Sequence, residues 1–398
     1  MIQTKIQNPG IRKSAAGSSL LNVSTEIVHL YDEEQPLQLE SGEYLPEVQV
    51  AYQTYGKLNK DGDNAVLVCH ALTGNSHVAG ILKGEEFDRG SSPDLLNKYS
   101  KVYAGKPGWW DPLIGPGKVL DTEKYFVICP NFLGSCYGTT GPLSEFKGKR
   151  YGRDFPVVTV RDMVRVQKRL LEFLGVNKLK TVTGGSLGGM QVLEWLLLYP
   201  QIVETAIPIA TSTAHSPWAV SLNQAAREAI FADAKFNNGI YTDQPYNGLA
   251  LARRIAMISY RSFDSFGKRF GRERVRNNGT YDQTNKFQIE SYLDHHGDRI
   301  IERFDANTYI TITYAMDFHD ISKDRGDMIE VLHSIKQPVL SLGISTDVLY
   351  PAKEQQEYIQ HVQNGHYTEL QSIHGHDAFL IEFDQLTTII DNFMAKYF

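Results

Sequence analysis

The sequence predicts an α/β fold, in which a mostly parallel, doubly wound sheet carries an inserted helical lid domain. Apolar runs alternate with amphipathic segments over 64–210 and resume after 337, a pattern typical of parallel strands joined by helices. Between these two parts the chain is mostly helical in pattern, polar and rich in Arg and Tyr. We therefore expect a core domain from 1–211 and 326–398, and a helical lid insertion over 212–325.

The first half of the chain is expected to supply most of the strands. Residues 26–31 and 48–56 have the pattern of edge strands, whereas 64–72 and 125–131 are continuous apolar runs, which mark buried strands. The segment 159–175 repeats apolar residues at helical spacing and ends at a glycine, so it predicts a helix.

The second half continues the alternation on either side of the insertion. A strand over 179–185 leads into a helix over 187–200, which a proline ends. The remaining expected elements are strands at 203–210, 337–345 and 366–373 and a last helix near 378–397.

The composition of the 398-residue chain argues against several classes of partner. Its formal net charge of −6 and pI near 6.1 give no attraction to nucleic acid or to an anionic membrane. No apolar run reaches the length of a membrane span, and the N-terminus lacks the apolar core of a signal peptide. The three cysteines, Cys69, Cys129 and Cys136, cannot all pair and fit no metal site. We expect a cytoplasmic protein without a metal.

The stretch Gly184–Gly188 is a G-x-S-x-G pattern at the point where a strand is expected to lead into a helix. Such a turn holds the serine in a strained conformation above the sheet, so the pattern predicts Ser186 as a nucleophile. The alternative is a Gly-rich loop that binds phosphate. That alternative lacks the Lys-Ser/Thr of a P-loop and the spacing of G-x-G-x-x-G.

A serine nucleophile needs a base, and the base needs a carboxylate that orients it. In chain order after the serine, Asp347 and His376 each follow a late predicted strand, where open α/β sheets place their sites. His374 competes for the role of base. We choose His376 because it follows Gly375 and precedes a helix. The alternative acids, which rank lower because they precede the strand, are Asp317 and Asp320.

Acyl chemistry also needs an oxyanion hole, formed by N–H groups that point at the developing negative charge. One donor is expected from Leu187, the residue that follows the nucleophile. The second is expected from the loop after the third strand, and we assign it to Leu72. The alternative is that the residues around Leu72 only end a strand.

The sequence resembles one family over most of its length. The chain is similar to the homoserine O-acyltransferases, enzymes of the α/β-hydrolase fold that open one route to methionine. The matching stretches run in order from about residue 45 to the C-terminus. They are HALTG (70–74), GWWDPLIGPGK (108–118), DTEKYFVICPN (121–131), GSCYGTTGP (134–142), DFPVVTVRDMVRVQ (154–167), GGSLGGMQ (184–191), GLALARRIAMISYRS (248–262), RFDANTYI (303–310) and GHDAFL (375–380).

The resemblance implies a triad of Ser186, Asp347 and His376, in agreement with the chain-order argument. It also implies that Arg253, Tyr260 and Asp377 bind the acceptor. An Arg can grip an amino-acid carboxylate bidentately, and a carboxylate can pair with the ammonium. Two alternatives for the Arg are that the neighbouring Arg254 has this role, and that Arg253 only forms a surface salt bridge.

The expected reaction is ping-pong transfer of an acetyl group from acetyl-CoA to L-homoserine through an acyl-Ser186 intermediate. Acetyl-CoA is a substrate, and no permanently bound cofactor is expected. The resemblance also implies a homodimer, formed through apolar surface on the inserted helices. Alternatives are succinyl-CoA as donor, serine as acceptor, an esterase or thioesterase with the same triad, and a binding module without catalysis.

The segment 260–276 carries six Lys or Arg residues within the insertion. CoA carries several phosphates, so one hypothesis is that Lys268, Arg269 and Arg272 contact it. The alternative is a solvated basic face.

Overall fold

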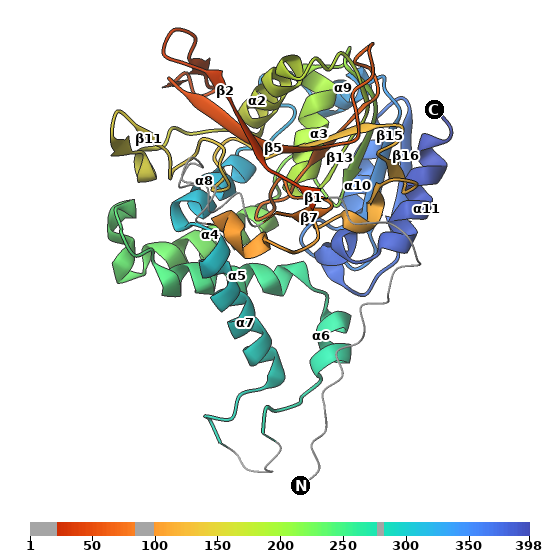
Figure 1. Ribbon diagram of the computed structural model, residues 1–398. Helices are drawn as coiled ribbons and strands as arrows, with labels where there is room; N and C mark the ends of the chain where they lie inside the picture. Colours follow the sequence, from red (N-terminus) through yellow and green to blue (C-terminus); the bar gives the residue numbers. More distant parts are fainter. Residues whose placement is uncertain (1–21, 84–98, 277–281) are drawn as a thin grey trace.

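The computed structural model describes residues 22–83, 99–276 and 282–398, and its centre is an eight-stranded sheet (Figure 1). The strand order is β16-β15-β14-β13-β6-β10-β5-β2. The two pairs formed by β5 are antiparallel and the other five are parallel, which confirms the predicted mostly parallel sheet. The strands are β2 (Glu26–Tyr31), β5 (Val48–Tyr55), β6 (Ala65–Cys69), β10 (Phe126–Pro130), β13 (Leu179–Gly185), β14 (Val203–Ile209), β15 (Val339–Ile344) and β16 (Gly365–Leu370).

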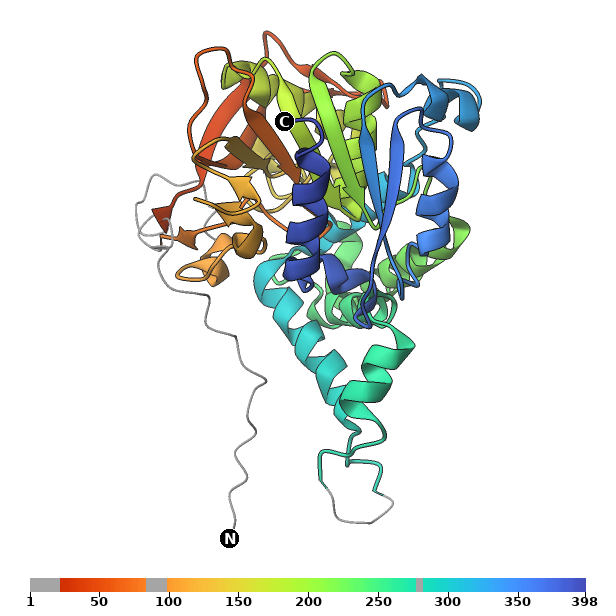
Figure 2. The ribbon, with the colours of Figure 1, turned by 90° about the vertical axis from the view of Figure 1, so that its right-hand side faces the viewer.

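Helices cover both faces of this sheet, as a doubly wound arrangement requires. The helices α2 (Val160–Phe173), α3 (Leu187–Leu198), α9 (Met328–Ser334) and α10 (Ala352–Ile359) share one apolar core with the sheet. The other face packs against α11 (Phe383–Met394), which crosses the front of the sheet in Figure 2. Local signals agree with these elements. For example, Thr159 and Asp162 form a capping box that starts α2.

The region predicted as an insertion contains five α-helices among its described residues. They are α4 (Pro217–Phe231), α5 (Tyr246–Tyr260), α6 (Phe263–Phe270), α7 (Gln288–Arg303) and α8 (Ala306–Asp317). Helix α7 crosses α5 where Gly297 lies against the carbonyl of Ala250. Together α6 and α7 extend away from the sheet as an arm (Figures 1 and 2). The exact limits of a separate lid domain stay a prediction.

One strand position and two element boundaries differ from those expected. Strand β5, expected at an edge of the sheet, lies inside it between β10 and β2, whereas β2 is an edge strand as expected. The strand expected over 64–72 ends at Cys69 as β6, because the chain then leaves the sheet in a turn. The helix expected near 378–397 is two elements, a 3-10 turn η6 (Gly375–Leu380) and then α11. Within the described ranges, every helix is too short or too polar to cross a bilayer.

Candidate active site

Ser186 lies in a sharp turn between β13 and α3, at the carboxyl end of the strand. Its φ of 59° and ψ of −126° are strained for a residue with a side chain. Gly184 and Gly188 both press on the carbonyl oxygen of Cys69 in β6, and a Cβ on either would overlap that oxygen. The glycines therefore allow the turn to sit directly against β6, as the G-x-S-x-G pattern predicts.

Neighbouring strands and loops hold the strained turn in place. The N–H of Ser186 donates to the carbonyl of Ile209 at 2.9 Å, and its carbonyl accepts from the Thr211 hydroxyl at 2.9 Å. Gly185 packs against the ring of Phe379, where an added Cβ would lie 2.6 Å from a ring carbon. The turn is thus fixed from the side of β14 and from the side of η6.

Asp347 and His376 meet as the sequence predicts. The Nδ1 of His376 lies 2.7 Å from Oδ2 of Asp347, and both side chains are buried. The other carboxylate oxygen of Asp347 accepts from the N–H groups of Leu349 and Tyr350 at 2.8 and 3.1 Å. Burial alone would lower the pKa of His376, but the charge and hydrogen bond of Asp347 outweigh it and raise that pKa. The imidazole is therefore held in one orientation by a carboxylate that is itself held by the backbone.

The competing residues have other partners. Asp317 binds the Nδ1 of His215 at 3.0 Å and pairs with Arg227 at 2.7 Å. Asp320 accepts from the backbone and hydroxyl of Ser322. The Nδ1 of His374 has no hydrogen-bond partner among the described residues. Asp317 thus also orients a histidine, but the second ring nitrogen of His215 already lies 3.0 Å from the Tyr350 hydroxyl. In the described parts of the chain, the second ring nitrogen of His376 has no such partner, so the pair of Asp347 and His376 is the one that can serve a nucleophile.

The two predicted oxyanion donors follow the carboxyl ends of the neighbouring strands β6 and β13. Leu72 is the second residue of a β-turn over 71–74, which the Gly74 N–H closes on the Ala71 carbonyl at 2.9 Å. Leu187 begins α3, where the first N–H groups have no partner within the helix. In the described parts of the chain, neither of these two N–H groups has a hydrogen-bond partner. Both are free to bind an oxyanion.

Aromatic rings surround His376. The ring centroids of Tyr260, Tyr350 and Phe379 lie 5.7, 5.3 and 5.7 Å from that of His376. Tyr260 was expected near the acceptor, whereas sequence reasoning missed Tyr350 and Phe379. Tyr350 lies three residues after Asp347, and Phe379 lies three residues after His376. That spacing was the only signal in the sequence that could have placed these two rings at the site.

The neighbouring arginines of α5 point to different surroundings. Arg253 is 9% exposed, and its guanidinium lies 5.2 Å from the centroid of the Tyr260 ring. Its Nη1 is buried without a hydrogen-bond partner in the described residues. Arg254 also has a buried nitrogen, Nε, without a partner among the described residues, but its Nη2 pairs with Asp294 of α7 at 3.2 Å and its side chain is about one-third exposed. Of the two arginines, Arg253 is therefore the one that lies against Tyr260, the ring that contacts His376.

Asp377, the third predicted acceptor-binding residue, lies on η6 next to His376. Its carboxylate is 3.4 Å from Nε of Arg261, and its side chain is 20% exposed. Sequence reasoning missed another arginine, Arg303 at the end of α7. Its Nη1 donates to the carbonyl of Thr73 in the 71–74 turn, which is called the oxyanion turn below. Arg303 falls within the matching stretch RFDANTYI, but nothing local to that stretch indicates a contact with residue 73.

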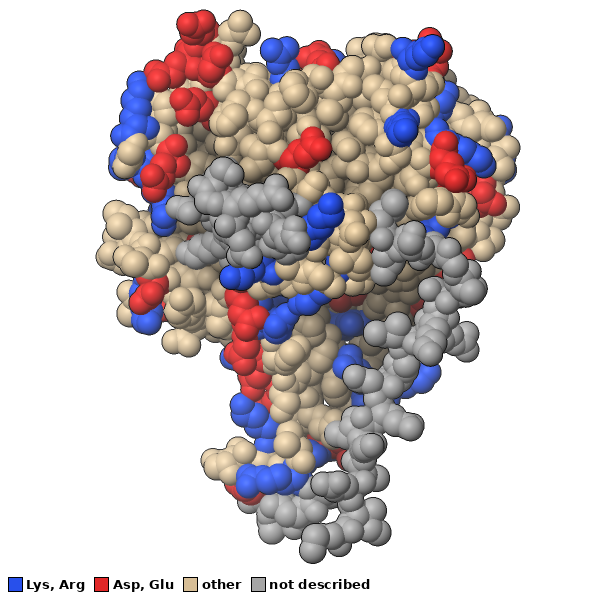
Figure 3. Space-filling view, viewed as in Figure 1, with Lys and Arg blue, Asp and Glu red and all other residues tan. Residues whose placement is uncertain are grey.

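The basic segment of the insertion lies on the projecting arm. Lys268, Arg269 and Arg272 are exposed, and the guanidinium of Arg269 lies 4.9 Å from the centroid of the Tyr292 ring. Acidic side chains accompany the basic ones along the arm in Figure 3. The contact with CoA stays a prediction.

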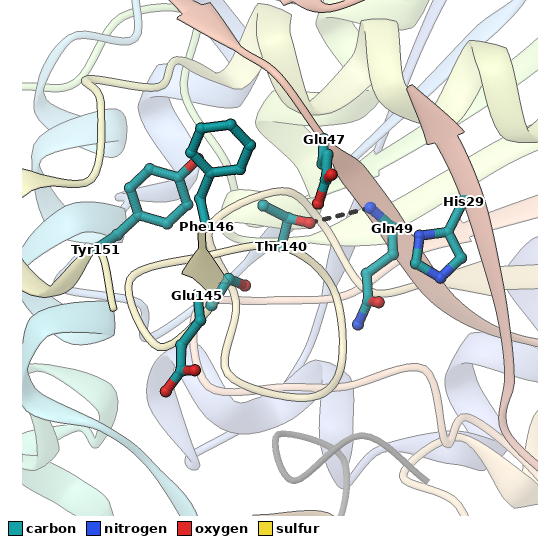
Figure 4. A pocket seen from close by; sticks show the side chains of 8 residues that line it. His29, Glu47, Gln49, Thr140, Glu145, Phe146 and Tyr151 are labelled. Carbon is teal, nitrogen blue, oxygen red and sulfur yellow. Dashed lines mark hydrogen bonds between the residues drawn. The ribbon is translucent and has the colours of Figure 1, made fainter. Parts of the chain in front are cut away.

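A hollow of about 150 Å³ lies beside β5 and contains no triad residue. Glu47 and Glu145 line it, together with His29 and Tyr151 (Figure 4). The backbone N–H of Gln49 donates to the hydroxyl of Thr140 across its wall at 3.0 Å. Two carboxylates repel phosphates, so this hollow is unsuited to the phosphates of CoA. Among the described residues, no cluster of His, Cys, Asp and Glu could hold a metal ion.

Comparisons with known proteins agree with this geometry. Residues 64–383 match the model of the alpha/beta hydrolase fold family. A homoserine O-acetyltransferase of Moorella thermoacetica is 48% identical over 374 residues, which cover 92% of this chain and 95% of that protein. The chain belongs to the homoserine O-acetyltransferase family. It is therefore an acyltransferase by family.

Two similar solved structures, one named a transferase and the other an esterase, have the same fold as this chain. The crystal structure of homoserine O-acetyltransferase from Bacillus anthracis has a TM-score of 0.82 at 29% identity, and covers 94% of this chain and 98% of its own. The crystal structure of esterase E22 has a TM-score of 0.80 at 28% identity, and covers 94% of this chain and 100% of its own. The scaffold of this family thus also occurs in an enzyme named for ester hydrolysis, so residues around the triad must distinguish the two activities.

Proposed function

We propose that the enzyme transfers an acetyl group from acetyl-CoA to the side-chain hydroxyl of L-homoserine through an acyl-Ser186 intermediate. The observation that carries this proposal is the Nη1 of Arg253, which is buried and has no hydrogen-bond partner among the described residues. The guanidinium lies against the ring of Tyr260, and that ring in turn lies 5.7 Å from the ring of His376 between centroids. An esterase passes its acyl group to water and needs no such cation. An amino-acid acceptor brings a carboxylate, which would supply the missing partner.

In the first half-reaction, Ser186 Oγ attacks the thioester carbonyl carbon while Nε2 of His376 takes the hydroxyl proton. The new C–O bond gives a tetrahedral oxyanion, which accepts from the N–H groups of Leu72 and Leu187. Collapse of this intermediate breaks the C–S bond, and the sulfur leaves with the proton from His376. Free CoA departs and the acetyl group remains on Ser186.

In the second half-reaction, the acceptor hydroxyl occupies the place that the thiol left. His376 takes its proton, the oxygen attacks the acetyl carbon, and the bond to Ser186 Oγ breaks as the proton returns to the serine. Arg253 grips the acceptor carboxylate and Asp377 pairs with the ammonium. Asp377 is shared with Arg261, so binding of the acceptor competes with that contact.

The product in this proposal is O-acetyl-L-homoserine, which the family resemblance assigns to methionine biosynthesis. A cytoplasmic location fits the three unpaired, buried cysteines. A homodimer fits the apolar side chains exposed on the insertion, where Leu251, Ile258 and Phe263 are 46, 56 and 90% exposed.

Thiol release from acetyl-CoA, measured with and without L-homoserine, tests the proposed transfer. We expect release to be limited to about one thiol per enzyme without acceptor and to turn over when L-homoserine is present. Ser186→Ala should abolish both the burst and the trapped acetyl-enzyme. Equal turnover with and without acceptor would show hydrolysis instead, and labelling at another residue would overturn the triad.

The same assay, run with two donors and two acceptors, measures which substrates the enzyme prefers. We expect acetyl-CoA to be preferred over succinyl-CoA. The preference for L-homoserine over L-serine rests on one methylene, which is worth only about 1–3 kcal/mol. A lower kcat/KM for acetyl-CoA than for succinyl-CoA would reassign the donor while leaving the triad intact.

A further inference from the structure

Arg303 is the last residue of α7 and reaches into the core from the predicted insertion. Its Nη1 donates to the carbonyl of Thr73 at 2.9 Å and to the hydroxyl of Tyr103 at 3.1 Å. Its Nη2 lies 3.4 Å from the hydroxyl of Thr73. No carboxylate lies within ion-pair distance of it in the parts of the chain that the structure describes. The Arg303 side chain is half-buried. A half-buried cation with only neutral partners loses part of its hydration without a countercharge, so its position calls for a reason.

The contact of Arg303 is made with the oxyanion turn itself. Thr73 is the third residue of the β-turn over 71–74, and Leu72 is the second. The turn has one backbone hydrogen bond of its own, from Gly74 to Ala71. The Ala71 carbonyl also lies 2.9 Å from Nδ1 of His70. Both contacts fix the carbonyl at the start of the turn and leave the direction of its later peptide groups less restrained. The bond from Arg303 to the Thr73 carbonyl adds a further restraint, on the residue after the N–H that is expected to bind the oxyanion.

The end of α7 is itself fixed, so Arg303 can transmit a restraint. The hydroxyl of Tyr137 donates to the carbonyl of Arg303 at 2.6 Å, and it lies 3.4 Å from the hydroxyl of Tyr103. The next residue, Phe304, is fully buried and packs at 6.0 Å between ring centroids on Tyr137. Arg303 is thus held both at its backbone carbonyl and at its guanidinium.

We propose that Arg303 is a positioning residue, which holds the 71–74 turn so that the Leu72 N–H points at the acyl carbonyl oxygen. Through this contact the end of α7 becomes part of the oxyanion hole. The positive charge of Arg303, held against Thr73, would also favour negative charge bound by the N–H of the preceding residue, Leu72. This inference rests on the proposed function, because it assumes an oxyanion held by Leu72.

Arg303→Met and Arg303→Lys test the proposal in the full-length enzyme. We expect Arg303→Met to lower the rate constant of the acetyl-CoA burst about tenfold to a hundredfold, somewhat less than deletion of an oxyanion donor. The KM for L-homoserine should change by less than about twofold, because Arg303 does not contact the acceptor. Arg303→Lys keeps the charge and one donor, so it should recover part of the lost rate.

A tetrahedral analogue gives a readout that a purely structural role would not change. A trifluoromethyl ketone adds to Ser186 Oγ as a hemiketal anion, so its inhibition constant reports the oxyanion hole directly. We expect Arg303→Met to weaken this inhibitor in proportion to the burst rate. The matched control is Arg254→Met on α5, whose guanidinium pairs with Asp294. It should alter neither quantity.

Other outcomes overturn the inference. An unchanged burst rate would mean that the turn holds itself, and a loss confined to the homoserine KM would make Arg303 an acceptor-binding residue. Loss of fold in both variants would assign Arg303 to stability alone. Failure of the proposed function is recognised separately, by a burst that survives Ser186→Ala in otherwise unaltered enzyme.

Discussion

The imidazole of His376 is subject to two opposing influences. Burial disfavours the charged ring, whereas the carboxylate of Asp347 at 2.7 Å favours it, and the second influence wins. The pKa of His376 is therefore higher than usual. A base must be neutral to accept the proton of Ser186, so activity should be lost as the pH falls through this raised pKa.

The pH profile of kcat/KM checks this balance. We expect the acidic limb of the native enzyme to have its midpoint above about 6.5, the ordinary pKa of histidine. Asp347→Asn removes the charge that raises the pKa, so the midpoint should move to lower pH. The rate should also fall, by about 10⁴-fold if the loss matches that of other triads. An unchanged midpoint in Asp347→Asn would contradict the assignment of the pKa shift to Asp347.

Arg253 and Arg254 offer a matched pair of neighbouring substitutions. Arg253→Met should raise the KM for L-homoserine by the equivalent of about 2–5 kcal/mol, the cost of removing one partner of a buried charge pair. The acetyl-CoA burst should be preserved, because in the proposed mechanism acylation precedes acceptor binding. Arg254→Met should leave both quantities near those of the native enzyme. A slower burst in Arg253→Met would instead place Arg253 in the acylation step.

Sequence reasoning located residues whose chemistry is tied to a nearby strand end. Ser186, Asp347 and His376 follow directly from their positions after β13, β15 and β16. Arg303 and Tyr350 were missed because their contacts join distant parts of the chain. The contact of Arg303 with Thr73 spans 230 residues, and no local pattern encodes such a separation.

At the scale of elements, the contact of α3 with β6 decides how the nucleophile is presented. Gly188 in the first turn of α3 touches the backbone carbonyl of Cys69 at the end of β6. Backbone on both sides leaves no flexible side chain that could give way. The strand that leads to the oxyanion turn and the helix that begins after Ser186 are thus packed as one unit.

Gly188→Ala should force α3 away from β6. The added methyl group overlaps the Cys69 carbonyl, so we expect a loss of about 1–3 kcal/mol in the free energy of unfolding, as in other overpacked sites. Gly267→Ala is the matched control, because Gly267 lies within α6 with nothing within 4 Å of an added Cβ. It should be stabilising by about 0.5–1 kcal/mol. Denaturant unfolding measures both, and equal stabilities would contradict the packing argument.

Element boundaries were the least predictable part of the fold. A single helix was expected near 378–397, but Ile381 leaves helical conformation at φ −132° and ψ −44° and separates η6 from α11. The apolar residues of both segments have helical spacing, so their pattern does not reveal the break. The break matters for the site, because η6 carries both His376 and the Phe379 ring that supports the Ser186 turn.

At the scale of the whole molecule, the insertion presents apolar side chains to solvent. Ile258 on α5 is 56% exposed and Phe263 at the start of α6 is 90% exposed. Ile258 lies near the end of α5 and Phe263 begins α6, so both flank the junction of these two helices. Exposed residues of this size on adjacent helices are typical of surfaces that bind another chain.

Substitution of this surface tests the proposed homodimer. We expect Ile258→Glu combined with Phe263→Glu to give a monomer in light scattering coupled to size exclusion, because each charge would be buried in the interface. Phe173→Glu is the control, since Phe173 is 59% exposed at the end of α2 in the core domain. It should remain dimeric. A dimer that survives the double substitution would place the interface elsewhere.

The three cysteines, Cys69, Cys129 and Cys136, are all buried and unpaired, and burial raises the pKa of each thiol. The proposed thioester donor would leave a free thiol in solution at every turnover, and disulfide exchange requires an accessible thiolate. Burial of the three cysteines would thereby protect the enzyme from mixed disulfides with the thiol that the proposed reaction releases. A chromogenic disulfide reagent should find no reactive thiol in the native protein and three per chain in denaturant. Colour developed during catalysis would then report released product alone.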